Sequence, residues 1–265
     1  MVKEFQRKNY WAVILGGSSG LGLATAKKLA KHGMHICVIH RNSRAQLPEI
    51  EKEFEQIKSE GVQFISFNID VCNKAKQEAT LNKVQEVLNG QGKIKTLIHS
   101  IAKGNLKSMI SDGEAELQAE DFTLTINNMA ISLYDWVKAI FKLNLFADDT
   151  RIISFTSEGN TKAWQNYAAV SAAKVTLEAI TRNIALEFVP YGIRANCIQA
   201  GVTDTESLRM IPGSKQLKKH SLERNPFKRL TKPEDVANAA YLLCKKEAKW
   251  INGTIIKVDG GESLS

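Results

Sequence analysis

A glycine-rich turn between an apolar strand and a helix constrains this chain more than any other feature. Residues 10–16 form a near-continuous apolar run, which is typical of a strand buried on both faces of a parallel sheet. The turn Gly16-Gly-Ser-Ser-Gly-Leu-Gly22 follows, and the residues after it have helical spacing. This order of elements predicts a dinucleotide-binding fold, in which the turn holds a diphosphate at the helix N-terminus.

Each glycine of the turn has its own expected role. Gly16 permits the tight turn, Gly20 lets the backbone approach the diphosphate, and Gly22 lets the helix pack closely against the strand. The alternative is an ordinary tight turn between a strand and a helix, with no ligand. The cofactor contacts expected here are Gly16, Ser18, Ser19, Gly20, Leu21 and Gly22.

A second apolar strand, residues 35–40, ends in the basic sequence Arg41-Asn-Ser-Arg44. At this strand end an acidic residue would bind both free hydroxyls of the adenosine ribose. Arg41, Ser43 and Arg44 instead suit a 2′-phosphate through charge-assisted hydrogen bonds. NADPH is therefore the expected cofactor and NADH the less favoured one. The alternative is a loop with two solvated arginines.

Strand and helix patterns alternate along the rest of the chain. Further strands are expected at 63–70, 95–102, 151–157, 193–199 and 253–259. The alternation predicts a single α/β domain over residues 1–265, with a Rossmann-type doubly wound parallel sheet of about seven strands and helices on both faces. Residues 206–231 are loosely patterned and rich in Lys and Arg, which suits a substrate-binding lid within this domain.

The strand ends carry further candidate contacts, because in an open α/β sheet ligands collect at the carboxyl ends of the strands. Asp70 and Val71 follow the third strand, where an adenine ring would lie, although Asp70 is equally suited to cap the next helix. Ser157 brings a hydroxyl to the end of the fifth strand. The exit of the sixth strand supplies Gly201, Val202, Thr203 and Thr205.

A long helix is expected from Tyr167 to about residue 185, and it carries Lys174. Seven residues at about 100° each amount to nearly two full turns, so the phenol and the ammonium share one face. A nearby cation favours the phenolate, so Lys174 would lower the pKa of Tyr167 and make it a usable proton donor near neutral pH. The alternative is an ordinary amphipathic helix with a boundary Tyr and a surface Lys.

A helix expected to begin near residue 121 carries Asn127 on an otherwise apolar stripe. An Asn inside a helix is unfavourable unless it is hydrogen-bonded. Asn127 is thus a candidate link in a water or proton chain, and the alternative is a satisfied core amide.

Composition limits which cellular compartment and which binding partners are expected. The four cysteines have no metal-ligand spacing, which favours reduced core thiols in a cytoplasmic protein and predicts no bound metal. No apolar run approaches the length of a membrane span, so no membrane partner is expected. The net charge is +8, but no basic block is interleaved with aromatic residues, so nucleic acid is not an expected partner.

Over nearly its whole length the chain resembles the short-chain dehydrogenase/reductase superfamily. The shared marks are the Gly16-to-Gly22 turn, Asp70-Val71, the hydroxyl at Ser157, the Tyr167–Lys174 helix and the closing Val258-Asp-Gly-Gly261. Most members separate the Tyr from the Lys by three residues, whereas six separate Tyr167 from Lys174 and position 170 is Val. That spacing, and the strand exit Ile98-His-Ser-Ile-Ala102, look most like the NADPH-dependent enoyl-[acyl-carrier-protein] reductases.

The resemblance implies reduction of the 2,3 double bond of an enoyl thioester in fatty acid biosynthesis. Tyr167 would stabilise or protonate the enolate oxygen, Lys174 would hold the nicotinamide ribose, and Ser157 would hydrogen-bond the thioester carbonyl. The fourth strand exit would add Ser100, Ile101 and Ala102 to the cofactor contacts.

The resemblance also implies a homotetramer that acts on a small acyl thioester, which an acyl carrier protein would deliver. Carrier proteins are acidic, so a basic patch near the lid would suit docking, with a solvated basic loop as the alternative. The residues of this patch are Lys215, Lys218, Lys219, Arg224, Lys228 and Arg229.

Some departures from the enoyl pattern leave other functions open. Leu15 replaces the usual Thr before the first glycine, and residues 162–165 lack the second Tyr of the enoyl subtype. Ser157 falls where short-chain dehydrogenases have their catalytic Ser, so a 3-oxoacyl or ketone reductase is the first alternative. A dinucleotide-binding regulatory protein without turnover is the second alternative, which the intact Tyr167 and Lys174 disfavour.

Overall fold

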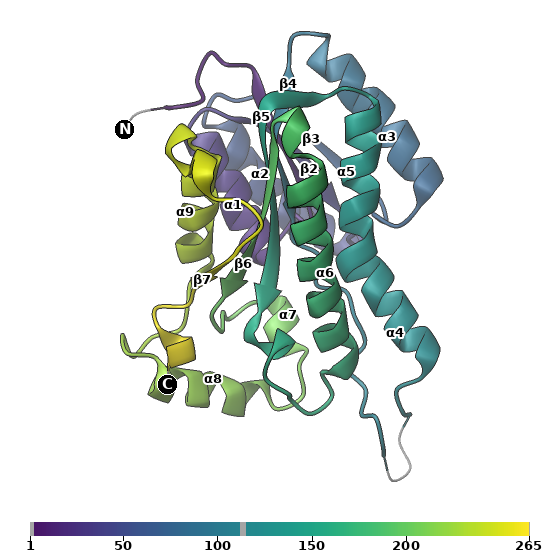
Figure 1. Cartoon of the computed structure of the whole chain (residues 1–265), viewed down its shortest axis with the longest axis vertical. Coiled ribbons are helices and arrows are strands. Elements are labelled where there is room, and N and C mark those ends of the chain that lie inside the picture. The colour runs from purple at the N-terminus through teal and green to yellow at the C-terminus, as the bar shows by residue number, and fades with distance from the viewer. Residues whose placement is uncertain (1–2, 112–114, 265) are drawn as a thin grey trace.

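Parallel strands form a seven-stranded sheet between two layers of helices in the computed structural model, which describes residues 3–111 and 115–264 (Figure 1). The strand order is β3-β2-β1-β4-β5-β6-β7, so the predicted doubly wound, single-domain fold is confirmed. The strands are β1 (Tyr10–Leu15), β2 (His35–His40), β3 (Phe64–Asn68), β4 (Lys93–His99), β5 (Phe146–Ser157), β6 (Ile193–Ala200) and β7 (Ile255–Val258).

The helices alternate with these strands. A π-helical turn over Asn127–Ile131 joins the fourth helix to the fifth. The α-helices are α1 (Gly20–Lys31), α2 (Leu47–Lys58), α3 (Lys74–Leu88), α4 (Ala119–Ile126), α5 (Ser132–Lys142), α6 (Ala168–Glu187), α7 (Glu206–Arg209), α8 (Ser214–Arg224) and α9 (Pro233–Cys244).

Side chains of β1 face the two helical layers in turn, because successive residues of a strand point to opposite faces of the sheet. Val13 and Leu15 pack in a core with α3, α5 and α6, whereas Ala12 and Ile14 pack with α1, α2 and α9. Figure 1 shows α5 and α6 on one side of the sheet and α1 and α9 on the other. Burial on both faces explains why the strand reads as a continuous apolar run.

The strand order reverses at β1. The chain passes from β1 outward to β2 and β3, and it then crosses back to place β4 on the other side of β1. The turn after β1 lies at this reversal of the strand order. There the Gly16 N–H donates to the Ile39 carbonyl and the Ser100 N–H donates to the Leu15 carbonyl. Ligands of open α/β sheets bind at such a reversal, which positions the candidate site.

Residues 206–231 are more regular than the sequence indicates, since they contain α7 and α8. Tyr167 lies at the N-cap position of α6, one residue before the helix begins. All four cysteines lie within the described residues and are free thiols. No helix within residues 3–111 or 115–264 has the length and apolar character needed to cross a membrane.

Candidate active site

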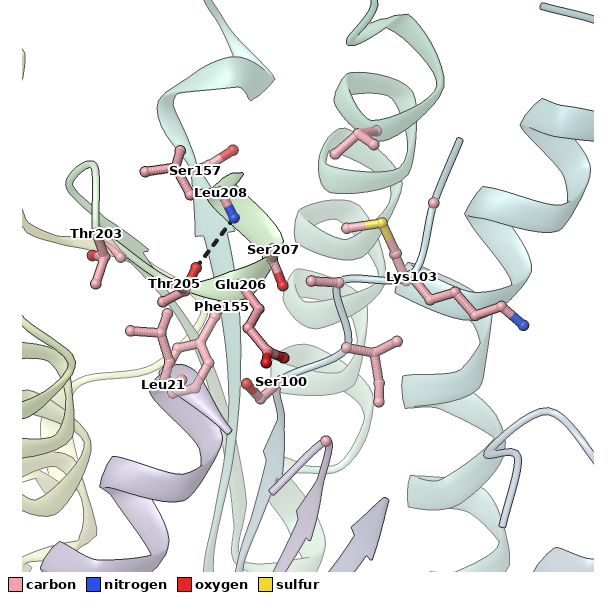
Figure 2. Close-up of a pocket in the computed structure, with 18 of the residues that line it drawn as sticks. Leu21, Ser100, Lys103, Phe155, Ser157, Thr203, Thr205, Glu206, Ser207 and Leu208 are labelled. Atoms are coloured by element: carbon pink, nitrogen blue, oxygen red, sulfur yellow. Dashed lines mark hydrogen bonds between the residues drawn. The ribbon is translucent and has the colours of Figure 1, made fainter. Parts of the chain in front are cut away.

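A cleft with a volume of about 540 Å³ lies at the carboxyl ends of the strands and gathers most of the predicted residues. Figure 2 shows Ser157 at the end of β5, with Thr203 and the α7 segment on the same cleft. The predicted residues that line it are Gly16, Ser18, Ser19, Gly20, Leu21, Arg41, Asp70, Val71, Ser100, Ile101, Ala102, Ser157, Tyr167, Lys174, Gly201, Val202, Thr203 and Thr205.

The glycine turn leaves backbone open to the cleft. Gly16 has a φ of +83°, and a Cβ there would lie 2.3 Å from the Ser100 carbonyl oxygen. A Cβ at Gly20 would first meet the Thr205 methyl at 3.4 Å, so this backbone faces the open cleft. The first N–H groups of α1 point out of the helix without intrahelical acceptors, and they therefore fit an anion.

Gly22 lies outside the cleft lining and serves packing instead. A Cβ at this position would lie 2.1 Å from the Gly16 carbonyl oxygen and 3.1 Å from the Ser100 side chain. Only glycine lets α1 approach the turn this closely, as the sequence predicted. Its contribution to a cofactor site is therefore indirect.

Of the three phosphate ligands predicted after β2, the structure brings one to the cleft lining. Arg41 lines the cleft, whereas Ser43 and Arg44 are exposed outside its lining, at a short 3-10 turn over Arg44–Gln46. The Ser43 hydroxyl donates to Gln46 instead. Of these three residues, only the one directly after β2 therefore lines the cleft.

Arg41 forms an ion pair with Asp70 at the cleft, beyond the ends of β2 and β3. The two side chains are 2.5 Å apart at Nη1 and Oδ2, and the Lys103 ammonium lies 3.7 Å from the same oxygen. Burial would raise the pKa of Asp70, but a hydrogen bond from the Cys72 N–H and the charges of Lys103 and Arg41 hold the pKa below its ordinary value. Asp70 therefore stays ionised and orients Arg41.

The Ser157 and Tyr167 hydroxyls lie 3.3 Å apart at the centre of the cleft. A Cβ at Gly159 would lie 2.4 Å from the Tyr167 ring, so this glycine permits the close approach. The Trp164 ring packs at 5.1 Å from the Tyr167 ring on the other side. Both hydroxyls can reach one acceptor atom, which suits an oxyanion.

Lys174 is buried beside this pair, and its Nζ donates to the Phe155 carbonyl at 2.7 Å. Burial lowers the pKa of Lys174 to about 8, although the Cys197 and Glu178 side chains oppose the shift. Burial raises the pKa of Tyr167, and the Ser157 hydrogen bond only partly offsets it. Burial thus raises the Tyr167 pKa overall, against the expectation that Lys174 lowers it.

Asn127 is a predicted site residue, but its neighbour Asn128 lines the cleft instead. Asn127 is exposed, whereas Asn128 is buried and lines the cleft. The Asn128 side-chain amide donates to the Leu124 carbonyl at 2.8 Å, and the Asn128 backbone carbonyl accepts from the Ser132 hydroxyl at 2.7 Å. The π-helical turn shifts the helical phase here, so the stripe expected for a regular helix does not hold.

Two groups of cleft residues were not predicted as such from sequence patterns. The first is an apolar cluster that packs around Tyr167, and it includes Leu106, Met129, Trp164, Val170 and Ile211. The second is an ion-pair cluster of Glu158, Arg224 and Glu262, with Arg224 buried rather than available for docking. Arg224 belongs to a lysine-rich segment whose pattern indicated a solvated surface.

Comparisons with known proteins agree with this arrangement. A family model described as "Enoyl-(Acyl carrier protein) reductase" matches residues 16–263. The curated dehydrogenase/reductase SDR family member 4 of Sus scrofa is 27% identical and covers 96% of this chain and 87% of its own length.

Solved structures share the fold over nearly the whole chain. The Bacillus cereus enoyl-acyl carrier protein reductase, in a complex with NADP+, has a TM-score of 0.87 and 23% identity, and the match covers 100% of this chain and 99% of that one. A Bacillus anthracis short chain dehydrogenase has a TM-score of 0.79 and 28% identity, with 97% and 98% covered.

Proposed function

The chain belongs to the short-chain dehydrogenase/reductase superfamily of oxidoreductases, and from this premise we propose that it reduces the 2,3 double bond of an enoyl thioester with NADPH. The observation that carries the choice of reaction is the position of the cleft phenol. Tyr167 lines the cleft at the start of α6, and Val170 occupies the place where most members carry their Tyr. The phenol is therefore placed three residues earlier along the chain than in most members. This position suits a substrate whose oxygen is remote from the carbon that is reduced.

The chain's own residues would hold NADPH in three places. The glycine turn and the start of α1 bind the diphosphate, and Arg41 binds the 2′-phosphate. Lys174 gives one of its three N–H donors to Phe155, which leaves two for the hydroxyls of the nicotinamide ribose. When bound, NADPH supplies the hydride, while the protein orients the reactants and supplies the electrostatic environment.

Tyr167 and Ser157 would handle the oxygen of the substrate. The Tyr167 phenol is protonated at neutral pH because burial raises its pKa, so it can donate to a developing enolate oxygen. The Ser157 hydroxyl, 3.3 Å away, gives a second hydrogen bond to the same oxygen. The apolar cluster of Leu106, Met129, Trp164, Val170 and Ile211 receives the acyl chain.

The second candidate function is reduction of a 3-oxoacyl or ketone carbonyl. The direct pairing of Ser157 with Tyr167 favours it, because the same two hydroxyls can protonate an alkoxide. Trp164, rather than a second tyrosine, packs against Tyr167, which also departs from the enoyl subtype.

A paired assay distinguishes the candidates. Oxidation of NADPH and of NADH is followed with crotonyl-coenzyme A and with acetoacetyl-coenzyme A. We expect turnover of the crotonyl thioester with NADPH as the preferred cofactor. Turnover of the acetoacetyl thioester alone would replace the proposal with the carbonyl reductase, and NADPH binding without any turnover would indicate a regulatory protein.

The proposal extends to an acyl carrier protein as the partner, to a homotetramer and to a cytoplasmic location. Lys215, Lys219, Lys228 and Arg229 are the exposed members of the basic patch. Arg229 pairs with Asp235 at 2.6 Å and Lys219 approaches Glu223 only at 4.0 Å, so Lys215, Lys219 and Lys228 are the charges to reverse. Reversing these three charges should raise KM for a carrier-linked substrate and spare the coenzyme A analogue. Equal loss on both substrates would reject the docking role, and sedimentation of the purified protein tests the tetramer.

A further inference from the structure

Arg224 is the one member of the basic patch whose charge faces the cleft. It is the last residue of α8, and its side chain is only 9% exposed although the neighbouring Leu222 and Glu223 are exposed. Its Nε has no hydrogen-bond partner among the described residues. Desolvating a guanidinium is costly, so its position calls for partners that compensate the charge.

Two carboxylates from distant parts of the chain supply this compensation. Glu158 accepts from Nη1 at 3.1 Å and from Nη2 at 2.5 Å, and Glu262 accepts from Nη2 at 2.8 Å. A guanidinium that spans two oxygens of one carboxylate fixes both orientation and distance. These ion pairs join α8 to the end of β5 and to the turn after β7, which lie at the same end of the sheet (Figure 1).

Glu158 connects this bridge to the catalytic hydroxyls. It directly follows Ser157, which ends β5 and lies 3.3 Å from the Tyr167 hydroxyl. Burial would raise the pKa of Glu158, but hydrogen bonds from Arg224 and Lys162 hold the pKa below its ordinary value. The carboxylate is therefore charged, and its ion pair with Arg224 of α8 restrains the backbone next to Ser157.

Glu262 connects the bridge to the loop after β6. Its Oε2 accepts from the Val202 N–H at 3.1 Å, and a Cβ at Gly201 would lie 2.9 Å from the same oxygen. Val202 and Thr203 line the cleft. The Arg224 guanidinium is thus linked through Glu158 to the Ser157–Tyr167 hydroxyl pair. It is linked through Glu262 to the loop at Val202.

We propose that Arg224 is a positioning residue that ties α8 to the geometry of the Ser157–Tyr167 pair and of the Val202 loop. Arg224 does not contact the reacting atoms and acts through Glu158 and Glu262. Loss of the Arg224 guanidinium would leave Glu262 without this ion pair and Glu158 with only the exposed Lys162. The kinetic consequences rest on the proposed thioester reduction, but the structural coupling does not.

Substitutions of Arg224 in the full-length protein test this role. With crotonyl-coenzyme A and NADPH, Arg224→Met should lower kcat by about 10- to 100-fold, because a displacement of about 1 Å at a reacting group costs on this order. Arg224→Lys keeps the charge without the planar fork and should restore part of kcat. The loss should fall on kcat rather than on the KM for NADPH, since Arg224 positions groups and does not bind the cofactor.

A double-mutant cycle separates positioning from general destabilisation. Glu158→Gln should lower kcat in the wild-type background and cost much less in the Arg224→Met background, because the two residues act as one unit. Arg194→Met is the matched control. Arg194 is also a partly buried arginine, paired with Asp149 at the opposite end of the sheet, and its loss should lower the Tm without changing kcat.

A readout without substrate distinguishes this inference from the proposed function. Arg224→Met should make residues 206–231 more sensitive to trypsin than Arg194→Met does, whether or not the wild type reduces a thioester. Equal proteolysis and equal kcat in these two variants would overturn the inference. If Arg224→Met does not fold, Arg224→Lys and Glu158→Gln carry the test, and wild-type kcat and proteolysis in both would overturn it.

Discussion

The Tyr167 hydroxyl lies 3.3 Å from the Ser157 hydroxyl, and this contact joins the start of α6 to the end of β5. The two residues come from different elements, so neither helix periodicity nor strand alternation brings them together. Gly159 permits the contact, because a Cβ there would lie 2.4 Å from the Tyr167 ring.

Tyr167→Phe keeps the ring and removes the proton donor. Loss of a general acid lowers kcat by about 100- to 10,000-fold, and we expect a loss in this range with either thioester. NADPH binding, measured by fluorescence titration, should be unchanged because the ring still fills its site. A variant that retains wild-type kcat would show that the phenol is not the donor.

Ser157→Ala distinguishes the two candidate reactions. If Ser157 only assists Tyr167 at an enolate, its loss should cost less than the roughly 100-fold seen when a principal oxyanion donor is removed. Ser157→Thr should restore the activity because it returns the hydroxyl. A loss as large as that of Tyr167→Phe would instead favour carbonyl reduction.

Lys174 predicts an alkaline limit to activity. Burial lowers its pKa to about 8, so the ammonium is charged below that pH and loses its proton above it. The kcat/KM for NADPH, which reports ionisations of the free enzyme, should therefore fall as the pH rises through about 8. Lys174→Arg should move this decline to higher pH, since a guanidinium stays charged. An unchanged decline in this variant would assign it to another group.

Arg41 and Arg44 form a matched pair for cofactor preference. Arg41→Ala should weaken NADPH binding by about 10- to 100-fold, the range for a hydrogen bond to a charged group, and leave NADH binding unchanged. Arg44→Ala should affect neither cofactor, because Arg44 is exposed outside the cleft lining. Equal effects of the two substitutions would contradict the assignment of the 2′-phosphate site.

Gly22→Ala tests the close approach of α1 to the glycine turn. Alanine would favour the helix by about 1 kcal/mol on propensity alone. Its Cβ would lie 2.1 Å from the Gly16 carbonyl oxygen, however, so the turn must shift. We expect the free energy of unfolding in urea to fall by about 1–3 kcal/mol, with weaker NADPH binding. A stabilised variant would show that the helix has room.

Local patterns alone were enough to predict the strands and the main helices. The apolar runs over residues 10–16 and 35–40 became β1 and β2, and the glycine turn lies between β1 and α1 as expected. A buried parallel strand must be apolar on both faces, and a close backbone approach requires glycine, so these features are visible in sequence. The Tyr167–Lys174 spacing likewise predicted that both residues face one cleft, and both line it.

The tertiary structure decided which polar residues face that cleft. Asn128 rather than Asn127 lines it because a π-helical turn shifts the phase, and Arg41 rather than Arg44 lines it because Arg44 lies in the 3-10 turn beyond β2. The pKa of Tyr167 depends on burial by segments far along the chain. Arg224 is buried by Glu158 and Glu262, which are distant in sequence, so no local pattern distinguishes it from its solvated neighbours. Periodicity describes the neighbours of a residue along one element, whereas burial and ion pairing depend on elements that only the fold brings together.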